Sequence, residues 1–211
     1  MERTILIGDY YVSSLPEDKF WQFFDTNRKQ VFSEDLDINP LDLMSADEQS
    51  ANKRLKSRMG TPWTLMLGIF CGDQCVGWSF GVQENAERFQ MRNTALLPLH
   101  RGKGIYTALL PIVLDEVRSQ GFQFIYSRHK ATNNAVLVPK PKAGFVITSF
   151  EISDIFGVLV HLSYCFNPLR KDLLDFRVGK QASTRVQKYL ESTSIVPGTK
   201  VLTQEPRSSR R

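Results

Sequence analysis

The first part of the chain combines a strand pattern with two helical ones. Residues 4–12 are mostly apolar and aromatic, which predicts a strand. After them, apolar side chains recur at the spacing of one helix face, at Phe20, Phe23, Phe24 and Val31. Ser14 and Glu17 have the capping-box spacing that would start this helix. Ser45 and Glu48 repeat that spacing and predict a second helix, which is short and polar.

From residue 63 onward the pattern changes to strands separated by helices. Three consecutive strands are predicted, over residues 63–70, 76–82 and 88–97. A helix follows to about Gln120, and Gly121 stands where a left-handed residue would end it. The remaining segments predict a strand, a short helical segment, a hairpin around Gly157 and a last helix, over residues 122–127, 132–142, 145–166 and 169–176. This order predicts an α/β fold of the α+β type, with a mixed central sheet of about seven strands flanked by helices.

The composition is typical of a soluble globular protein. Of the 211 residues, 42% are hydrophobic and 23% are charged. The apolar run near the N-terminus, Ile5 to Ile7, is too short for the core of a signal peptide. No run approaches the ~18 apolar residues that suggest a membrane span. The composition therefore predicts a cytoplasmic protein without a membrane partner.

The net charge of +5 comes entirely from the C-terminal segment. Residues 180–211 contain seven basic and two acidic residues, so residues 1–179 balance to zero. A nucleic-acid-binding domain should carry its own basic face, so this charge distribution argues against a nucleic-acid partner. We expect a single domain over residues 1–178 and a basic C-terminal extension over residues 179–211.

The cysteines and histidines predict neither disulfides nor a metal site. Three cysteines are too few, and odd in number, for a disulfide framework. Structural zinc sites usually need two close-spaced ligand pairs, whereas the three histidines are scattered along the chain.

A basic glycine turn, Arg101-Gly102-Lys103-Gly104, precedes the central helix. The first turn of a helix has backbone N–H groups without internal partners, and the helix dipole makes this end positive. Glycines allow close approach of an anion, and the two cations add charge. Thr107 could add a hydroxyl donor one turn further on. The turn therefore suits a phosphate or pyrophosphate, although a charged surface turn explains the same residues equally well.

The context of this turn resembles the GNAT superfamily of N-acetyltransferases. The first family signature, Arg/Gln-x-x-Gly-x-Gly/Ala, matches residues 101–106, except that Tyr106 replaces the last small residue. The second signature runs from an asparagine through a short helix to Gly-Phe, and Asn133 to Gly144-Phe145 has this interval. The resemblance covers residues 4–166, because the preceding order of helices and strands also agrees.

The resemblance implies acetyl-CoA as the acyl donor. Its pyrophosphate would lie on the amides of the turn, its pantetheine arm would pair with the strand that ends at residue 97, and an asparagine would hydrogen-bond that arm. The strands before and after the central helix would splay apart in mid-sheet to admit the thioester. The expected donor-binding residues are Leu96, Leu97, Arg101, Gly102, Lys103, Gly104, Ile105, Tyr106, Thr107 and Asn133.

The catalytic residues are less clearly marked. The family often has a tyrosine four residues before the Gly-Phe glycine, where it protonates the departing thiolate. This chain has Lys140 there, between two prolines, and we expect that lysine to be exposed to solvent. His129 is a candidate base because histidine titrates in the useful range. More remote candidates are Glu84 and Glu87, and Tyr126 is a candidate acid.

The acceptor side is predicted from two further segments. One of Tyr10 and Tyr11 is expected to line the acceptor pocket while the other packs under the first helix. The acidic side chains of residues 34–37 would suit a cationic amine, although such a run is also typical of a solvated face.

Three functional hypotheses remain from the sequence. The first is an N-acetyltransferase that transfers an acetyl group from acetyl-CoA to a primary amine of a small molecule or peptide, by direct attack on the thioester. The second is a degenerate relative that binds acyl-CoA for a regulatory or structural role. The third is a nucleic-acid or partner-binding protein that works through its basic tail. The family resemblance is also compatible with a homodimer.

Overall fold

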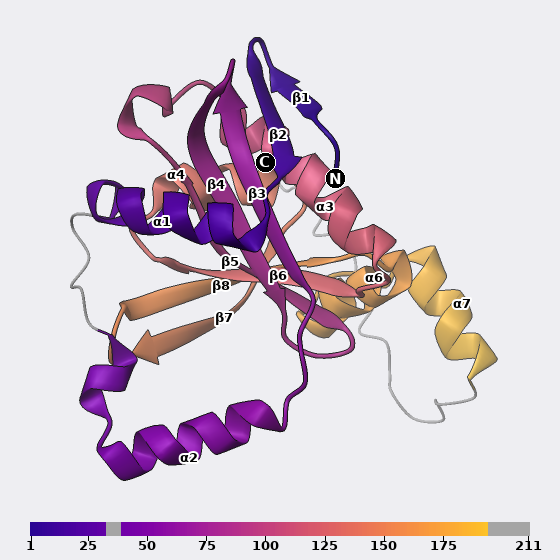
Figure 1. The fold of residues 1–211 in the computed structure, drawn as a ribbon. Helices are drawn as coiled ribbons and strands as arrows, with labels where there is room; N and C mark the ends of the chain where they lie inside the picture. Colours follow the sequence, from indigo (N-terminus) through magenta and orange to yellow (C-terminus); the bar gives the residue numbers. More distant parts are fainter. Residues whose placement is uncertain (33–38, 194–211) are drawn as a thin grey trace, which may run out of the picture. The chain divides into compact units, whose positions relative to one another are not determined.

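The computed structural model describes residues 1–32 and 39–193 of the chain (Figure 1). These residues form two compact units, Met1–Phe166 and the part from Asn167 onward. The first unit contains an eight-stranded sheet in the order β1-β2-β3-β4-β5-β6-β8-β7. Its strands are β1 Thr4–Ile7, β2 Tyr10–Ser14, β3 Thr64–Cys71, β4 Gln74–Gln83, β5 Arg88–Leu96, β6 Phe124–Lys130, β7 Val146–Ser153 and β8 Gly157–Cys165.

Neighbouring strands are antiparallel throughout, except that β5 and β6 are parallel. The predicted mixed sheet is therefore confirmed. It has one strand more than expected because residues 4–12 do not form a single strand. They fold into the β1–β2 hairpin instead, with Gly8 at φ 52°, a left-handed angle that glycine adopts without strain.

Helices cover both faces of this sheet. The first unit contains α1 Glu17–Val31, α2 Ala46–Ser57, α3 Ile105–Ser119, α4 Asn134–Leu137 and α5 Pro139–Lys142, with short 3₁₀ turns at Pro40–Leu43 and Pro98–His100. Because side chains alternate along a strand, Leu67 and Met66 of β3 face opposite ways. Leu67 joins the core under α3, and Met66 packs with Phe20 of α1 and Trp78.

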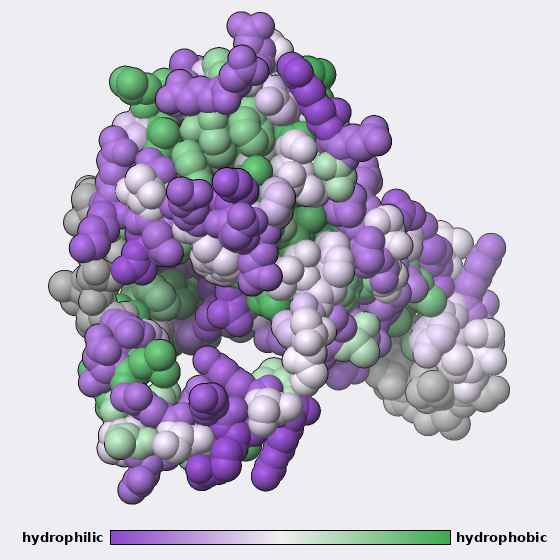
Figure 2. Space-filling view, viewed as in Figure 1, coloured by the Kyte–Doolittle hydropathy of each residue, from purple (hydrophilic) through white to green (hydrophobic). Residues whose placement is uncertain are grey.

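The helix ends show which local signals determine structure. Ser45 and Glu48 form the predicted capping box at α2. This helix has no buried residue, and its surface is mainly hydrophilic (Figure 2). The predicted capping box of Ser14 and Glu17 is wrong, because Ser14 is the last residue of β2. The N-cap of α1 is Pro16, and no side chain among the described residues caps this helix. Gly121 follows α3 at φ 91°, as predicted.

The second unit contains α6 Pro168–Arg177 and α7 Thr184–Ser192. Asp172 of α6 accepts hydrogen bonds from Ser183 Oγ at 2.7 Å and Arg185 Nε at 2.9 Å, which ties the start of α7 to α6. α7 was not predicted, because its segment was expected to be an extension. Residues 194–211 of that extension lie outside the described part of the chain. Within the described residues, no helix combines the length and apolar character needed to cross a membrane.

Candidate functional site

The sheet opens between its two parallel strands. β5 and β6 pair only at Arg88–Phe124, Phe89–Ile125 and Gln90–Tyr126. Both strands continue beyond these pairs, β5 to Leu96 and β6 to Lys130, so they separate and leave a slot between them. A cavity of about 640 Å³ fills this region. The predicted splay in mid-sheet is therefore present.

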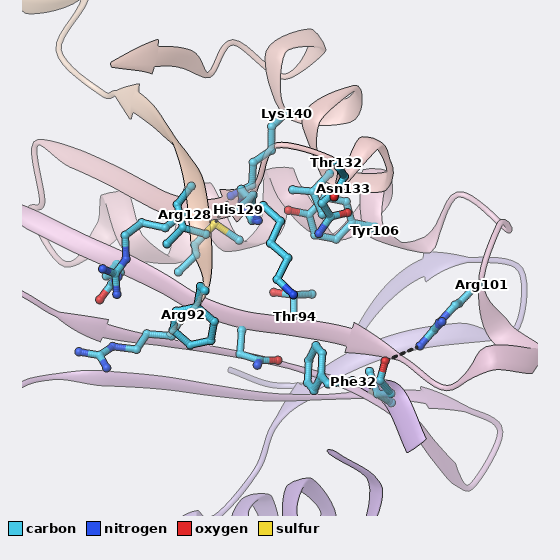
Figure 3. Close-up of a pocket in the computed structure, with 18 of the residues that line it drawn as sticks. Phe32, Arg92, Thr94, Arg101, Tyr106, Arg128, His129, Thr132, Asn133 and Lys140 are labelled. Atoms are coloured by element: carbon cyan, nitrogen blue, oxygen red, sulfur yellow. Dashed lines mark hydrogen bonds between the residues drawn. The ribbon is translucent and has the colours of Figure 1, made fainter. Parts of the chain in front are cut away.

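The charged side chains that line this cavity are all cationic. No carboxylate lines it within the described part of the chain (Figure 3). Such a lining favours an anionic ligand, because nearby positive charge stabilises negative charge. The cations are Arg92, Arg101, Arg128, Lys130 and Lys140.

Arg92 occupies a β-bulge in the wall of the slot. Phe80 of β4 pairs with Asn93 and the next residue, Gly81, pairs with Met91, so Arg92 is the extra residue of β5. Asn93 is held by the Trp78 indole, whose Nε1 donates to its side chain at 2.8 Å. Bulges redirect side chains and often lie next to functional sites.

The cavity is lined by Arg101, which begins the glycine turn, and by Tyr106, which follows it. Gly102 and Gly104 have φ angles of 75° and 76°, and Gly104 is the N-cap of α3. A Cβ at Gly102 would meet nothing within 4 Å, and one at Gly104 only Ile7 Cδ1 at 3.9 Å. The space beside this backbone is open, and the first amides of α3 have no helical acceptors. The turn therefore has the geometry of an anion site.

The two cations of the turn have structural partners as well. Arg101 Nε donates to the Leu96 carbonyl at 3.0 Å and its Nη2 to the Val31 carbonyl at 3.3 Å, which fixes the turn to the end of β5 and to α1. Lys103 Nζ donates to the Tyr10 hydroxyl at 3.1 Å.

The predicted donor-binding residues lie in three places. Three of them line the cavity: Arg101, Tyr106 and Asn133. Others are exposed on the turn and the first turn of α3: Gly102, Lys103, Gly104 and Thr107. The remaining side chains pack elsewhere: Ile105 is buried in the core, Leu96 packs against it, and the Leu97 amide donates to the Val76 carbonyl.

Tyr106 is the residue that departs from the glycine-rich signature. Its ring packs against the core cluster under the sheet and also borders the cavity. Burial raises the pKa of its phenol well above the usual range, so the hydroxyl stays neutral. The side chain of Tyr106 thus packs against the core and borders the cavity at the same time.

Three polar side chains from β6 and α5 are linked by hydrogen bonds, and two of them, His129 and Lys140, line the cavity. Lys140 Nζ donates to Ser127 Oγ, and Ser127 Oγ lies 2.8 Å from His129 Nε2. Lys140 and Ser127 are fully buried. The predicted solvent exposure of Lys140 is therefore wrong: α5 turns this side chain inward, toward Met91 and the ring of Phe145.

Burial controls the protonation of this cluster. It lowers the pKa of Lys140 to about 7, because an ammonium ion loses its hydration there. Burial, and then the charge of Lys140, lower the pKa of His129 to about 3, so the imidazole is neutral at neutral pH.

The fold has known counterparts among solved structures. It is similar to yncA of Salmonella typhimurium, described as a candidate acetyltransferase and solved with its cofactor acetyl-CoA, with a TM-score of 0.56 at 14% identity over 76% of this chain and 96% of that one. A GNAT family acetyltransferase from Elizabethkingia anophelis with acetyl-CoA bound gives 0.51 at 12% identity, over 75% and 99%. The chain has the GNAT fold.

A third similar structure is the ribosomal-protein-S18-alanine N-acetyltransferase from Escherichia coli, with a TM-score of 0.54 at 15% identity over 75% of this chain and 94% of that one. The sequence itself matches no protein-family model and no curated protein. The similarity to these structures therefore concerns the fold alone.

Within this GNAT fold, the two candidate catalytic residues face opposite sides of β6. His129 shares its face with Ser127, whereas Tyr126 points the other way, as alternation requires. The Tyr126 hydroxyl donates to Glu84 Oε1 at 2.5 Å. Burial, and then this glutamate, raise the pKa of Tyr126 to about 12. His129 lines the cavity and Tyr126 does not.

The two tyrosines expected near the acceptor do not line the cavity either. Tyr10 bonds His100 Nδ1 at 3.0 Å beside the glycine turn, and Tyr11 stacks on Phe70. The acidic segment of residues 34–37 lies outside the described residues. Ser127 is the residue that the sequence interpretation missed, and its only signal was its alternation with His129 on the strand.

Proposed function

We propose that this chain is an acetyl-CoA-dependent N-acetyltransferase that acts on a primary amine of a small molecule or peptide. One observation carries the proposal: β5 and β6 part after three residue pairs, and the cavity between them is also lined by Arg101 and Tyr106, which lie on either side of the two glycines at the start of α3. The slot has positive charge and a strand edge that is unpaired within the described residues, and the open backbone of the two glycines is next to it. A long, phosphorylated acyl carrier needs this combination.

The residues present fit such a donor. The amides that follow Gly102 and Gly104 would bind its pyrophosphate, assisted by the positive end of α3. Beyond Gln90, the side of β5 that faces the slot has no strand partner within the described part of the chain, so its backbone groups would pair with the pantetheine amides. Asn133, which borders the cavity, would hydrogen-bond the same arm.

The donor supplies an activated acetyl group, and the protein supplies position and electrostatics. Holding a thioester and an amine together replaces an encounter in solution by a reaction within one complex. Fixed N–H donors in the slot would stabilise the negative charge that develops on the thioester oxygen. The peptide-amine alternative is supported by the similar structure from Escherichia coli, which is named for acetylating an alanine of ribosomal protein S18.

A second function, acyl-CoA binding without turnover, is favoured by the state of the cavity histidine. With a pKa of about 3, His129 takes up no proton at neutral pH and is a poor general base. Such a protein would use the same slot as a sensor or a structural site.

Two measurements test the proposal. Thermal unfolding with acetyl-CoA should show a concentration-dependent rise in Tm, because a ligand that binds only the folded state stabilises it. Thiol release should then be followed with acetyl-CoA and a panel of amines and N-terminal peptides. Stabilisation with amine-dependent thiol release supports the enzyme, and stabilisation without thiol release supports the binding protein. No change in Tm would contradict both.

A further inference from the structure

The buried ammonium group of Lys140 constrains its neighbours because it can only donate hydrogen bonds. Within the described residues no carboxylate contacts it, and its polar partners are Ser127 Oγ and Met91 Sδ, the latter at 3.5 Å. The Phe145 ring lies 4.7 Å from Nζ. An ammonium ion has three donors and no acceptor, so Ser127 Oγ must accept its hydrogen bond.

Ser127 transmits this constraint to His129. The serine is fully buried, and in the described part of the chain its hydroxyl contacts Lys140 and His129 Nε2 alone. A buried hydroxyl hydrogen without an acceptor is costly. Since Lys140 cannot accept it, this hydrogen points to Nε2, which must then be unprotonated.

The hydrogen of the neutral imidazole must therefore be on Nδ1. A neutral ring carries one N–H and one bare nitrogen, and Nε2 is the bare one here. The ring of His129 lines the cavity beside Lys140 (Figure 3), and Nδ1 has no hydrogen-bond partner among the residues that the structure describes. The N–H of Nδ1 is consequently available to a ligand in the slot.

We propose that Lys140 is a positioning residue which, through Ser127, holds His129 as a hydrogen-bond donor to the acyl thioester in the cavity. The donor role rests on the proposed function, whereas the tautomer of His129 follows from the side chains alone. In this arrangement His129 offers no bare nitrogen to the cavity. It therefore does not take the proton of the attacking amine, contrary to the role that its position in the sequence predicted.

The arrangement depends on pH through Lys140. As the pH rises through about 7, Lys140 becomes a neutral amine that can accept from Ser127, and Ser127 can then accept from Nε2–H. The donor at Nδ1 is lost in that state. The other charged side chains around the cavity are Arg92, Arg101, Arg128 and Lys130, and its phenol is Tyr106, which stays neutral in this range. Of these side chains and Lys140, only Lys140 hydrogen-bonds Ser127 within the described residues, so the loss of its proton is what reverses the direction of the hydrogen bonds.

Long-range ¹H–¹⁵N spectra of the full chain without ligand test the tautomer directly. The chain has three histidines, and the His129→Gln variant assigns the signal. At pH 6 His129 should show the Nδ1–H form, and it should shift toward Nε2–H between pH 6 and pH 8.5. Lys140→Met should abolish this change. Lys142→Met, which removes an exposed lysine of the same helix, should leave it intact. An Nε2–H form at pH 6, or an unchanged transition in Lys140→Met, would overturn the proposal.

Acetyl-CoA then tests the donor role. Its addition should shift the Nδ1–H resonance in the wild type. Ser127→Ala and Lys140→Met should slow thiol release on the order of tenfold to a hundredfold at pH 6, with little change in acetyl-CoA affinity. They should also remove the fall in activity above pH 7 that this arrangement predicts for the wild type. If acetyl-CoA binds and both variants keep the wild-type pH profile, the positioning role is wrong. If acetyl-CoA does not bind, the proposed function and the donor role both fail, and the ligand-free spectra still decide the tautomer.

Discussion

At the scale of single residues, Lys140 couples the site to stability. An ionised amine in a fully buried position has lost its hydration without gaining a carboxylate. Its pKa falls from the ordinary 10.5 to about 7, so between these values the unfolded chain binds a proton that the folded chain does not. The free energy of unfolding therefore rises with pH between about 7 and 10.5. This gain in stability is lost again as the pH falls from 10.5 to about 7.

Replacing Lys140 by methionine should remove this dependence. The variant keeps a similar volume and contains no charge to desolvate, so we expect it to be more stable than the wild type at pH 6. The advantage should shrink by about 1.4 kcal/mol per pH unit between pH 7 and pH 10. Urea unfolding at pH 6, 8 and 10 measures the difference. An advantage of Lys140→Met that is constant with pH would show that the lysine does not titrate as the burial implies.

At the scale of elements, the sequence predicted what local signals determine. The glycine turn before α3, the helix end at Gly121 and the hairpin around Gly157 follow from residues that act on their own backbone. Ser14 and Glu17 carried an equally local signal that failed, because pairing of β2 with β3 uses Ser14 in a strand. At Ser14, strand pairing in the sheet therefore outweighs the local preference for a helix cap.

The Lys140–Ser127–His129 chain could not be predicted in the same way. Its members come from α5 and β6, and their contact depends on the direction in which α5 turns its side chains. Nothing in a lysine between two prolines indicates that direction. The motif around residue 140 predicted where a proton donor is expected, but the expectation that this lysine faces the solvent was wrong.

The glycine turn provides a prediction for the element itself. Gly104→Ala should weaken acetyl-CoA binding by tenfold or more, on the order of 1.4 kcal/mol, because a residue with a Cβ resists the left-handed angle that aims the first amides of α3. Gly121→Ala is the matched control at the other end of the helix, since it also has a positive φ and open space around its Cβ. Both variants should unfold at lower temperature, and calorimetric titration with acetyl-CoA should separate them. Equal affinity in the two would argue against the turn as the donor site.

At the scale of the whole molecule, the site belongs to the first unit alone. Every residue that lines the cavity lies between Gln30 and Leu159, whereas the second unit begins at Asn167. The second unit has its own polar ties, among them Lys180 and Lys171, which both bond Asp175 at 2.9 Å. The basic C-terminal part of the chain therefore contributes no side chain to the slot within the described residues.

Deletion of residues 180–211 should accordingly leave donor binding unchanged. The truncated chain loses α7 and the segment that carries the whole net charge of +5, while the glycine turn and the splay between β5 and β6 remain. We expect the acetyl-CoA affinity to stay within about twofold of the full chain, less than 0.5 kcal/mol. Titration of both proteins at two salt concentrations measures this. The truncated chain could instead bind acetyl-CoA much more weakly, and high salt could weaken binding by the full chain to the same extent. These two results together would show that the basic tail attracts the phosphorylated donor. Such a result would extend the site beyond the cavity to the C-terminal segment.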